Sequence, residues 1–297
     1  MGAKWFKCPD GEQIEIARCL ANGGCRMVSR CATRPYLRLV SHEREWRGVS
    51  PSAAGNGPRL IYLRQVTDFV TDPDAAAFAA VGTATHAKLS LHYYTRNVLS
   101  EEPLSDELMR GIPDVLEEDE DDPKSFVLTD YKTWGSYKVM KGLGIVQTEE
   151  KITDEAGNQL FFKTGKSAGQ PKTRKVYART GEPDLTSEEL QLNMYRIFFE
   201  KNGFPVSKMN VQAIVRDGAT FVAEGRGIDR RVYVLPIKRL DDRDVIGFYN
   251  VLRAEVGTAF KHGWVRRCNA WENWEGRRCQ EYCEVKNQCQ QMDQTQQ

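Results

Sequence analysis

The eight cysteines of this 297-residue chain fall into two groups, one toward each end. The groups are Cys8, Cys19, Cys25 and Cys31, and then Cys268, Cys279, Cys283 and Cys289. No cysteine lies between Cys31 and Cys268, so the long middle part has to fold without thiol cross-links. Closely spaced thiols in a reducing compartment favour metal ligation over disulfides. We therefore expect metal-ordered segments at both ends and a core between them.

The first residues and the net charge indicate where the protein is located and how it could bind a partner. The first residues, Met1 to Trp5, lead into polar sequence, and no apolar run approaches the roughly 20 residues of a membrane helix. We expect a cytoplasmic protein with no membrane partner. The formal net charge is +1 and the sequence pI is about 7.5, so the chain has no overall basic signature. A nucleic-acid partner would therefore bind local basic patches.

One segment in the middle of the chain carries the residue types that phosphodiester cleavage needs. Phe126-Val127-Leu128 is rich in strand formers, and Asp130 and Lys132, two residues apart, should share a face of that strand. A second apolar run contains Asp114, and a hairpin with its turn near Asp122 places Asp114 opposite Asp130. Two carboxylates can hold Mg2+ or Mn2+, and a lysine ammonium can orient the attacking water. The spacing predicts a metal-dependent site, although a solvated strand face is the alternative for such a triplet.

Two predicted helices flank this segment in the sequence. An alanine-rich helix over residues 74–94 carries His86, whose neighbours alone do not distinguish a ligand from a structural histidine. A second helix begins with a capping-box pattern at residues 186–189. Gln191 and Tyr195 are one turn apart on it and share a face, which either edges the core or lines a cleft.

Four short motifs follow one another along the chain. They are Gly82-Thr83-Ala84-Thr85-His86, Gly111-Ile112-Pro113-Asp114, Asp130-Tyr131-Lys132 and Gln191-Leu192-Asn193-Met194-Tyr195. In this order, over roughly residues 31–290, the series resembles the RecB-like branch of the PD-(D/E)XK nuclease superfamily. Many members of that branch carry Glu at the position of Asp130.

The resemblance implies a fold and a set of roles. The fold is α/β, a restriction-endonuclease-like core with a mixed central β-sheet flanked by helices. The implied metal ligands are His86, Asp114, Asp130 and the carbonyl of Tyr131. The implied catalytic groups are Asp114, Asp130, Lys132, Gln191 and Tyr195.

The same resemblance implies a function. It is that of an Mg2+- or Mn2+-dependent deoxyribonuclease, acting as an exonuclease on single strands or DNA ends, with endonuclease activity left open. One rival hypothesis is a catalytically silent nucleic-acid-binding or protein-interaction module that keeps a metal-stapled nuclease fold. Another is a zinc regulatory protein, which predicts duplex binding without cleavage.

The cysteines admit more than one grouping. Cys31 with Cys279, Cys283 and Cys289 is similar to the 4Fe-4S arrangement of CRISPR-associated RecB-like and AddB-type nucleases, although the gap between Cys279 and Cys283 is one residue longer here. A second tetrathiolate site would then use Cys8, Cys19, Cys25 and Cys268. The rival grouping is local, with four N-terminal cysteines on zinc and four C-terminal ones on iron-sulfur or zinc, because four thiolates suit either.

The chain is expected to have three parts. Residues 1–31 form a cysteine-rich segment, residues 32–263 the nuclease core, and residues 264–297 a second cysteine-rich segment. A basic insertion over about 149–180 is expected to contain a flexible loop, through 160–180, that is either solvated or binds nucleic acid. Its candidate DNA-binding residues are Lys163, Lys166, Lys172, Arg174 and Lys175. The acidic run 117–122 is expected to be a solvated hairpin turn.

Overall fold

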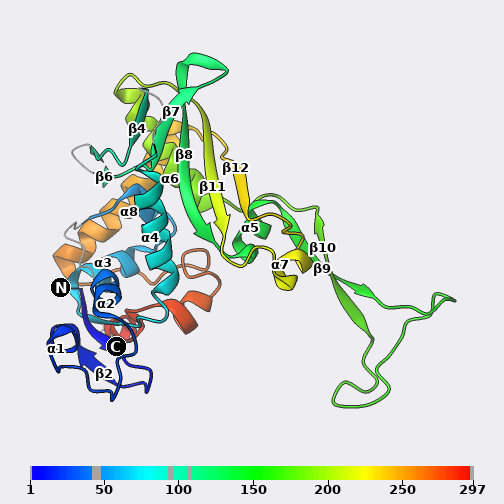
Figure 1. Cartoon of the computed structure of the whole chain (residues 1–297). Coiled ribbons are helices and arrows are strands. Elements are labelled where there is room, and N and C mark those ends of the chain that lie inside the picture. Colours follow the sequence, from blue (N-terminus) through cyan, green and yellow to red (C-terminus); the bar gives the residue numbers. More distant parts are fainter. Residues whose placement is uncertain (1, 42–47, 93–96, 106–108, 295–297) are drawn as a thin grey trace. The chain divides into compact units, whose positions relative to one another are not determined.

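The computed structural model describes residues 2–41, 48–92, 97–105 and 109–294. The chain divides into two compact units, and Figure 1 shows their elements. Unit 1 is built from three stretches, Met1–Thr129, Ser187–Met209 and Lys238–Gln297. Unit 2 is built from two, Asp130–Thr186 and Asn210–Ile237. Two strands therefore belong partly to one unit and partly to the other.

A five-stranded mixed sheet is the largest β-structure. Its strands, in spatial order, are β12 (Val232–Pro236), β11 (Val206–Val215), β8 (Asp122–Trp134), β7 (Val115–Asp119) and β4 (Val98–Ser100). The pairs β12/β11, β8/β7 and β7/β4 are antiparallel. Strands β8 and β11 run parallel, because the amide of Phe126 donates to Pro205 and, further along both strands, the amide of Arg216 donates to Trp134. The mixed α/β class predicted from the sequence is confirmed.

The β7–β8 hairpin forms where the sequence predicts it. Val115 pairs with Thr129, and Asp119 pairs with Asp122, so the turn lies next to Asp122 as expected. Buried and exposed residues alternate only in part along β7, since Val115, Leu116 and Asp119 are buried, Glu117 is exposed and Glu118 is half-buried.

The acidic run of this hairpin is not wholly solvated, contrary to expectation. Asp119 is buried and accepts hydrogen bonds from Ser207 Oγ at 2.6 Å and Lys208 Nζ at 3.0 Å. These partners, with the amide of Asp121, lower the pKa of Asp119 to about 2. The prediction was wrong for this residue, because β11 brings a hydroxyl and an ammonium against it.

Four helices account for much of the rest of the core, and the longest of them has a clear local signal at each end. They are α3 (Pro58–Val66), α4 (Ala77–Leu89), α6 (Thr186–Lys201) and α8 (Asp242–His262). Asp241 caps α8 by accepting from the amide of Arg243, and Gly263 ends it in the left-handed conformation at φ 73°. Helix α4 is shorter than the predicted helix over 74–94, of which residues 93 and 94 lie outside the described residues.

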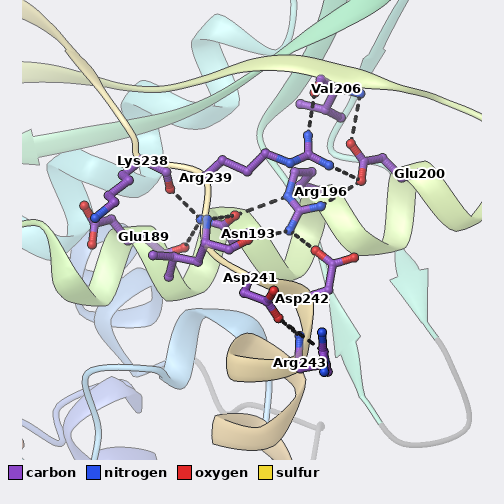
Figure 2. A network of polar contacts seen from close by, with 11 residues as sticks. Glu189, Asn193, Arg196, Glu200, Val206, Lys238, Arg239, Asp241, Asp242 and Arg243 are labelled. Carbon is purple, nitrogen blue, oxygen red and sulfur yellow. Dashed lines mark hydrogen bonds and ion pairs between the residues drawn. The ribbon is translucent and has the colours of Figure 1, made fainter.

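A network of polar contacts fastens α6 to the chain that leads into α8 (Figure 2). Arg196 is fully buried and donates to Glu200 at 2.7 Å and to Asn193 Oδ1 at 3.2 Å. It also pairs with Asp242 in the first turn of α8, while Asn193 donates to the carbonyl of Lys238 at 2.8 Å. A buried guanidinium is tolerated only with such partners. The network therefore fixes the rotation of α6 about its axis.

A small sheet and two short helices form the N-terminal part of unit 1. Its elements are β1 (Ala3–Lys7), β2 (Gln13–Glu15), α1 (Ile16–Leu20), α2 (Arg34–Val40) and β3 (Phe69–Thr71). Strand β1 pairs antiparallel with β2 and parallel with β3, which follows α3 in the chain. The buried residues of this part are Phe6, Cys8, Ile14, Cys19 and Leu37.

The segment after α8 packs on α3. It contains a π-helical turn, η2 (Arg278–Tyr282), and helix α9 (Lys286–Gln294). Arg59 of α3 is buried and donates to the carbonyl of Val265 at 2.6 and 2.9 Å and to Asp293 at 2.6 Å. The apolar cluster between these elements comprises Leu60, Tyr62, Leu63, Ala259, Val265 and Val285.

The remaining elements are short or belong to unit 2. Unit 1 also holds η1 (Pro51–Ala53), β5 (Leu104–Ser105) and β6 (Arg110–Gly111), and unit 2 holds α5 (Ser136–Gly142), β9 (Ile145–Lys151), β10 (Thr173–Arg179) and α7 (Phe221–Gly225). Strands β9 and β10 form an antiparallel ribbon, so the predicted loop is wrong for residues 173–179. Cross-strand pairs such as Arg174 with Glu150, 2.9 Å apart, stabilise the ribbon. Over the described ranges, every helix is too short or too polar to serve as a transmembrane span.

Candidate metal centre

Three potential metal ligands meet in unit 1. Nδ1 of His86 lies 3.2 Å from Oδ1 of Asp114. Glu101 completes the group, since one donor atom of each of the three side chains lies within 4.8 Å of the others. In the described part of the chain, no other group of three or more His, Cys, Asp or Glu side chains is this compact. One imidazole and two carboxylates form a donor set for a divalent cation.

Each ligand comes from a different element. His86 lies on α4, Glu101 follows β4, and Asp114 precedes β7. Ser100 pairs with Val115, and the amide of Glu101 donates to the carbonyl of Asp114 at 3.1 Å, which extends the pairing by one residue. The two carboxylates therefore project from neighbouring strands, with the helix residue beside them.

Glu101 has an unusual backbone conformation. Its φ is 54°, in the left-handed region that residues other than glycine seldom adopt, and such strain often accompanies functional sites. Partial burial raises the pKa of Glu101 and the Asp114 carboxylate raises it further, whereas His86 lowers it. Sequence analysis named His86 and Asp114 but missed Glu101, which stands after a three-residue strand without any periodic pattern.

The loop that carries Asp114 is held by Tyr195. The hydroxyl of Tyr195, on α6, donates to the carbonyl of Ile112 at 3.3 Å, and its side chain is almost fully buried. A Cβ at Gly111 would lie 2.5 Å from Tyr195 Cε1 and 2.9 Å from Pro51 Cδ, so glycine is required there by close approach. These contacts explain the glycine three residues before Asp114.

The two helix residues of the fourth motif are both buried. Gln191 is 8% exposed and Tyr195 is 2% exposed. Their one-turn spacing on α6 is confirmed by the helix, and the polar network on Arg196 holds that helix from another side. Tyr195 thus acts on the loop of Asp114 and is a positioning residue.

In unit 2, Asp130 and Lys132 form an ion pair on β8. Lys132 Nζ lies 2.5 Å from Asp130 Oδ2, and the two residues share a strand face because they are two apart. The Asp130 side chain is 5% exposed and that of Lys132 is 25% exposed. Tyr131, between them, is half-buried. The predicted pairing of a carboxylate with an ammonium on one strand face is present.

The candidate DNA-binding residues all lie on or beside the β9–β10 ribbon of unit 2. Lys163, Lys166, Arg174 and Lys175 are exposed, and Lys172 is half-buried with its ammonium 5.6 Å from the centre of the Phe162 ring. Register places Lys175 opposite Glu149, and Arg174 pairs with Glu150. The carboxylates of β9 therefore offset part of the positive charge of β10.

The N-terminal cysteines lie close to one another. Burial raises the pKa of the Cys19 thiol, and the charges of Cys25, Cys31 and Cys8 raise it further, whereas Arg30 lowers it. Cys8 and Cys19 are buried, Cys25 is half-buried and Cys31 is exposed. All eight cysteines of the chain are free thiols.

The C-terminal cysteines also interact among themselves. Burial raises the pKa of Cys268 and of Cys283, and smaller increases come from the charge of Cys289 on the first and of Cys279 on the second. These interactions, like those of Cys19, join cysteines of the same end of the chain.

The comparisons with known proteins do not assign this chain to a family. No protein-family model matches it, and no curated protein matches it significantly. Among solved structures, the chain is similar to one titled "Crystal structure of SSO0001", with 14% sequence identity, a TM-score of 0.39, and coverage of 84% of this chain and 91% of that chain. At this identity and TM-score the likeness carries no argument about function.

Proposed function

We propose that this protein is a metal-dependent deoxyribonuclease with a restriction-endonuclease-like core. The observation that carries the proposal is the group of His86, Glu101 and Asp114. Imidazole and carboxylate donors at this spacing fit Mn2+ or Mg2+, the cations that phosphodiester hydrolysis commonly uses. Such a cation supplies Lewis-acid stabilisation of the phosphate and lowers the pKa of a bound water.

Asp130 and Lys132 enter the proposal through the motif resemblance. Asp130 is the first residue of unit 2 and stands directly after Thr129, which pairs with Val115. The resemblance is the reason for proposing that both carboxylates serve one site. The proposed ligands are His86, Glu101, Asp114, Asp130 and the carbonyl of Tyr131.

Lys132 is proposed as the group that handles the attacking water and the charge on the phosphate. Its ammonium is held by the Asp130 carboxylate at 2.5 Å, which limits where the lysine side chain can point. An ammonium so held can donate to the water or to a phosphate oxygen as negative charge builds. Tyr195 holds the loop of Asp114 through its hydrogen bond to the carbonyl of Ile112. Gln191 lies one turn before Tyr195 on α6.

The proposed substrate is DNA, as single strands or at free ends, cut exonucleolytically. The motif resemblance is the reason for choosing DNA, and the exposed Lys163 and Lys166 offer phosphate contacts that are not offset by β9. Binding through such contacts should weaken as salt rises, because neutralised phosphates release counterions.

The C-terminal cysteines are proposed to bind a 4Fe-4S cluster or zinc. The donor set fits either centre, since the segment carries four cysteine thiols that can bind a metal as thiolates. Arg59 Nη1, 3.7 Å from Cys289 Sγ, adds a cation beside the sulfur. The centre would fasten the C-terminal segment to α3.

The first test is cleavage of end-labelled single- and double-stranded DNA with Mn2+, Mg2+ or EDTA. We compare the wild type with Lys132→Ala, and use Lys124→Ala as a matched control, since Lys124 is an exposed lysine on the same strand. We expect cation-dependent cutting that Lys132→Ala lowers by at least about a hundredfold and Lys124→Ala leaves unchanged. The product ladder shows polarity and strand preference.

Three outcomes contradict the proposal. Cutting that persists in EDTA, or that survives Lys132→Ala, removes the proposed mechanism. No cutting by a folded, metal-loaded wild type favours the catalytically silent binding module instead, and DNA retention measured on the same sample then tests that function.

A further inference from the structure

The four N-terminal cysteines have no role in the proposed cleavage, yet they gather in one small region of unit 1. We propose that Cys8, Cys19, Cys25 and Cys31 form a zinc site of their own, separate from the C-terminal cysteines. The site would order residues 2–41 against β3.

Two of the four ligands are already fixed by packing. Cys8 follows β1 and closes a tight turn, since its amide donates to Glu12 at 2.7 Å and its carbonyl accepts from Gly11 at 2.9 Å. Cys19 lies on α1, and both thiols are buried in the cluster around Phe6.

The other two ligands lie on the connection between α1 and α2. Gly24 allows this connection to double back, because a Cβ there would overlap the carbonyl oxygen of Arg18. Arg30 then ties it to α1 by donating to the carbonyl of Cys19 at 2.7 Å. Arg26, next to Cys25, pairs with Asp10 two residues after Cys8, and Arg30 stands next to Cys31, so the two loop cysteines are held near the segments of Cys8 and Cys19.

The charges around the thiols suit a tetrathiolate. Four thiolates carry two more negative charges than a zinc ion neutralises. Arg26 pairs with Asp10 beside the turn of Cys8, and the Arg30 guanidinium reaches the carbonyl of Cys19 at 2.7 Å. Two guanidinium groups therefore stand where the surplus negative charge would lie.

Cys25 and Cys31 would have to move toward Cys8 and Cys19 for zinc to bind. No three cysteine sulfurs of the described chain lie within 4.8 Å of one another, whereas sulfurs of a tetrahedral zinc site are about 3.8 Å apart. Cys25 and Cys31 are the more exposed of the four and lie outside helices and strands. Zinc would draw them in toward the buried Cys8 and Cys19, with loss of the thiol protons.

A zinc ion would also add stability to a region whose apolar core is small. Its core consists of Phe6, Cys8, Ile14, Cys19 and Leu37, so two of its five buried residues are themselves thiols. A core of this size does not order a segment by packing alone, and small domains are commonly stapled by a structural metal. Zinc serves that purpose without redox chemistry.

The test is a pair of matched double variants of the full chain, analysed by elemental metal content after anaerobic purification. Cys25→Ser with Cys31→Ser removes two proposed zinc ligands, and Cys279→Ser with Cys283→Ser makes the same change at the other end. We expect the first variant to lose about one equivalent of zinc and to keep the C-terminal metal. The second should keep that zinc and lose the C-terminal metal.

Two results would overturn the proposal. If the N-terminal variant keeps all its zinc, these cysteines do not bind it. If both variants lose the same metal, or the N-terminal variant loses iron, Cys31 shares a centre with the C-terminal cysteines. Mn2+-dependent DNA cleavage is measured in parallel, and its failure in the wild type leaves the zinc result standing, because the two sites use different residues.

A measurement on the wild type covers the case in which the variants do not fold. Cys31 is exposed, so an alkylating reagent should reach it unless a metal holds the sulfur. We expect Cys31 to be protected in the zinc-loaded protein and to be modified together with Cys25 after chelation, as mapped by peptide mass spectrometry. Equal modification of Cys31 with and without chelator would refute the site.

Discussion

Glu101 is the residue of the metal centre on which protons and metal ions compete. Burial and the Asp114 carboxylate raise its pKa, so the folded protein binds this proton more tightly than the unfolded chain does. Without metal, its contribution to stability is greatest at low pH and declines as pH rises from the unfolded pKa to the raised folded value. A cation reverses this preference, because it binds the carboxylate.

Removing that carboxylate should therefore change both the strength and the pH dependence of metal binding. We expect Glu101→Gln to weaken Mn2+ binding at least about tenfold at pH 7.5 and to flatten its decline toward acid pH. Calorimetric titration between pH 5 and pH 8 measures both, with the exposed neighbour Glu102→Gln as control. Equal binding by the two variants would show that Glu101 is not a ligand.

Single residues also mark the limit of sequence reasoning. His86 and Asp114 could be predicted because they stand in ordered motifs. Glu101 could not, because its position depends on the pairing of β4 with β7 and on a left-handed backbone. In the sequence, Asp119 is one of six consecutive acidic residues and has no distinguishing feature. The approach of Ser207 on β11 makes it a buried group with a low pKa.

At the scale of elements, the turn before β7 depends on how closely α6 approaches it. Gly111→Ala would press a methyl group against Tyr195 and Pro51, at 2.5 and 2.9 Å. We expect a loss of about 1–3 kcal/mol in the free energy of unfolding, together with weaker Mn2+ binding, because the loop of Asp114 must shift. Chemical denaturation and calorimetry measure these two effects.

A glycine in an open position is the control for that change. A Cβ at Gly247, on the exposed side of α8, would meet nothing within 4 Å. Gly247→Ala should raise stability by about 0.5–1 kcal/mol, since alanine favours the helix. If Gly111→Ala behaves in the same way, the close approach of Tyr195 does not constrain the turn.

Elements with local signals could be predicted well, and those without them could not. Helix α8 has its cap at Asp241 and its stop at Gly263, and the hairpin has two short apolar runs joined by an acidic turn. The sequence predicts a loop where β10 lies, because its lysines and arginines follow no strand pattern by themselves. Their pairing with the acidic residues of β9 is visible only in the structure. The parallel pairing of β1 with β3 has no signal in either strand alone.

At the scale of the whole molecule, the thiolate centres should govern the stability of both terminal segments. Thiolate coordination can contribute roughly 10 kcal/mol or more to folding, so its loss should release what it orders. We expect chelation under reducing conditions to raise amide hydrogen exchange in residues 2–41 and 264–294, while β8 and β11 stay protected. Unchanged exchange at both ends after complete metal removal would contradict this.

Unit 1 collects residues from the beginning, the middle and the far part of the chain, and this has a consequence for its synthesis. Arg59 leaves the ribosome long before Val265 and Asp293, the groups that accept its hydrogen bonds. Until those residues emerge, Arg59 lacks these hydrogen-bond acceptors and the apolar face of α3 stays uncovered. Unit 2 is completed at Ile237, so a nascent chain can close it first, and the emergence of residues 238–294 is the event that lets unit 1 close.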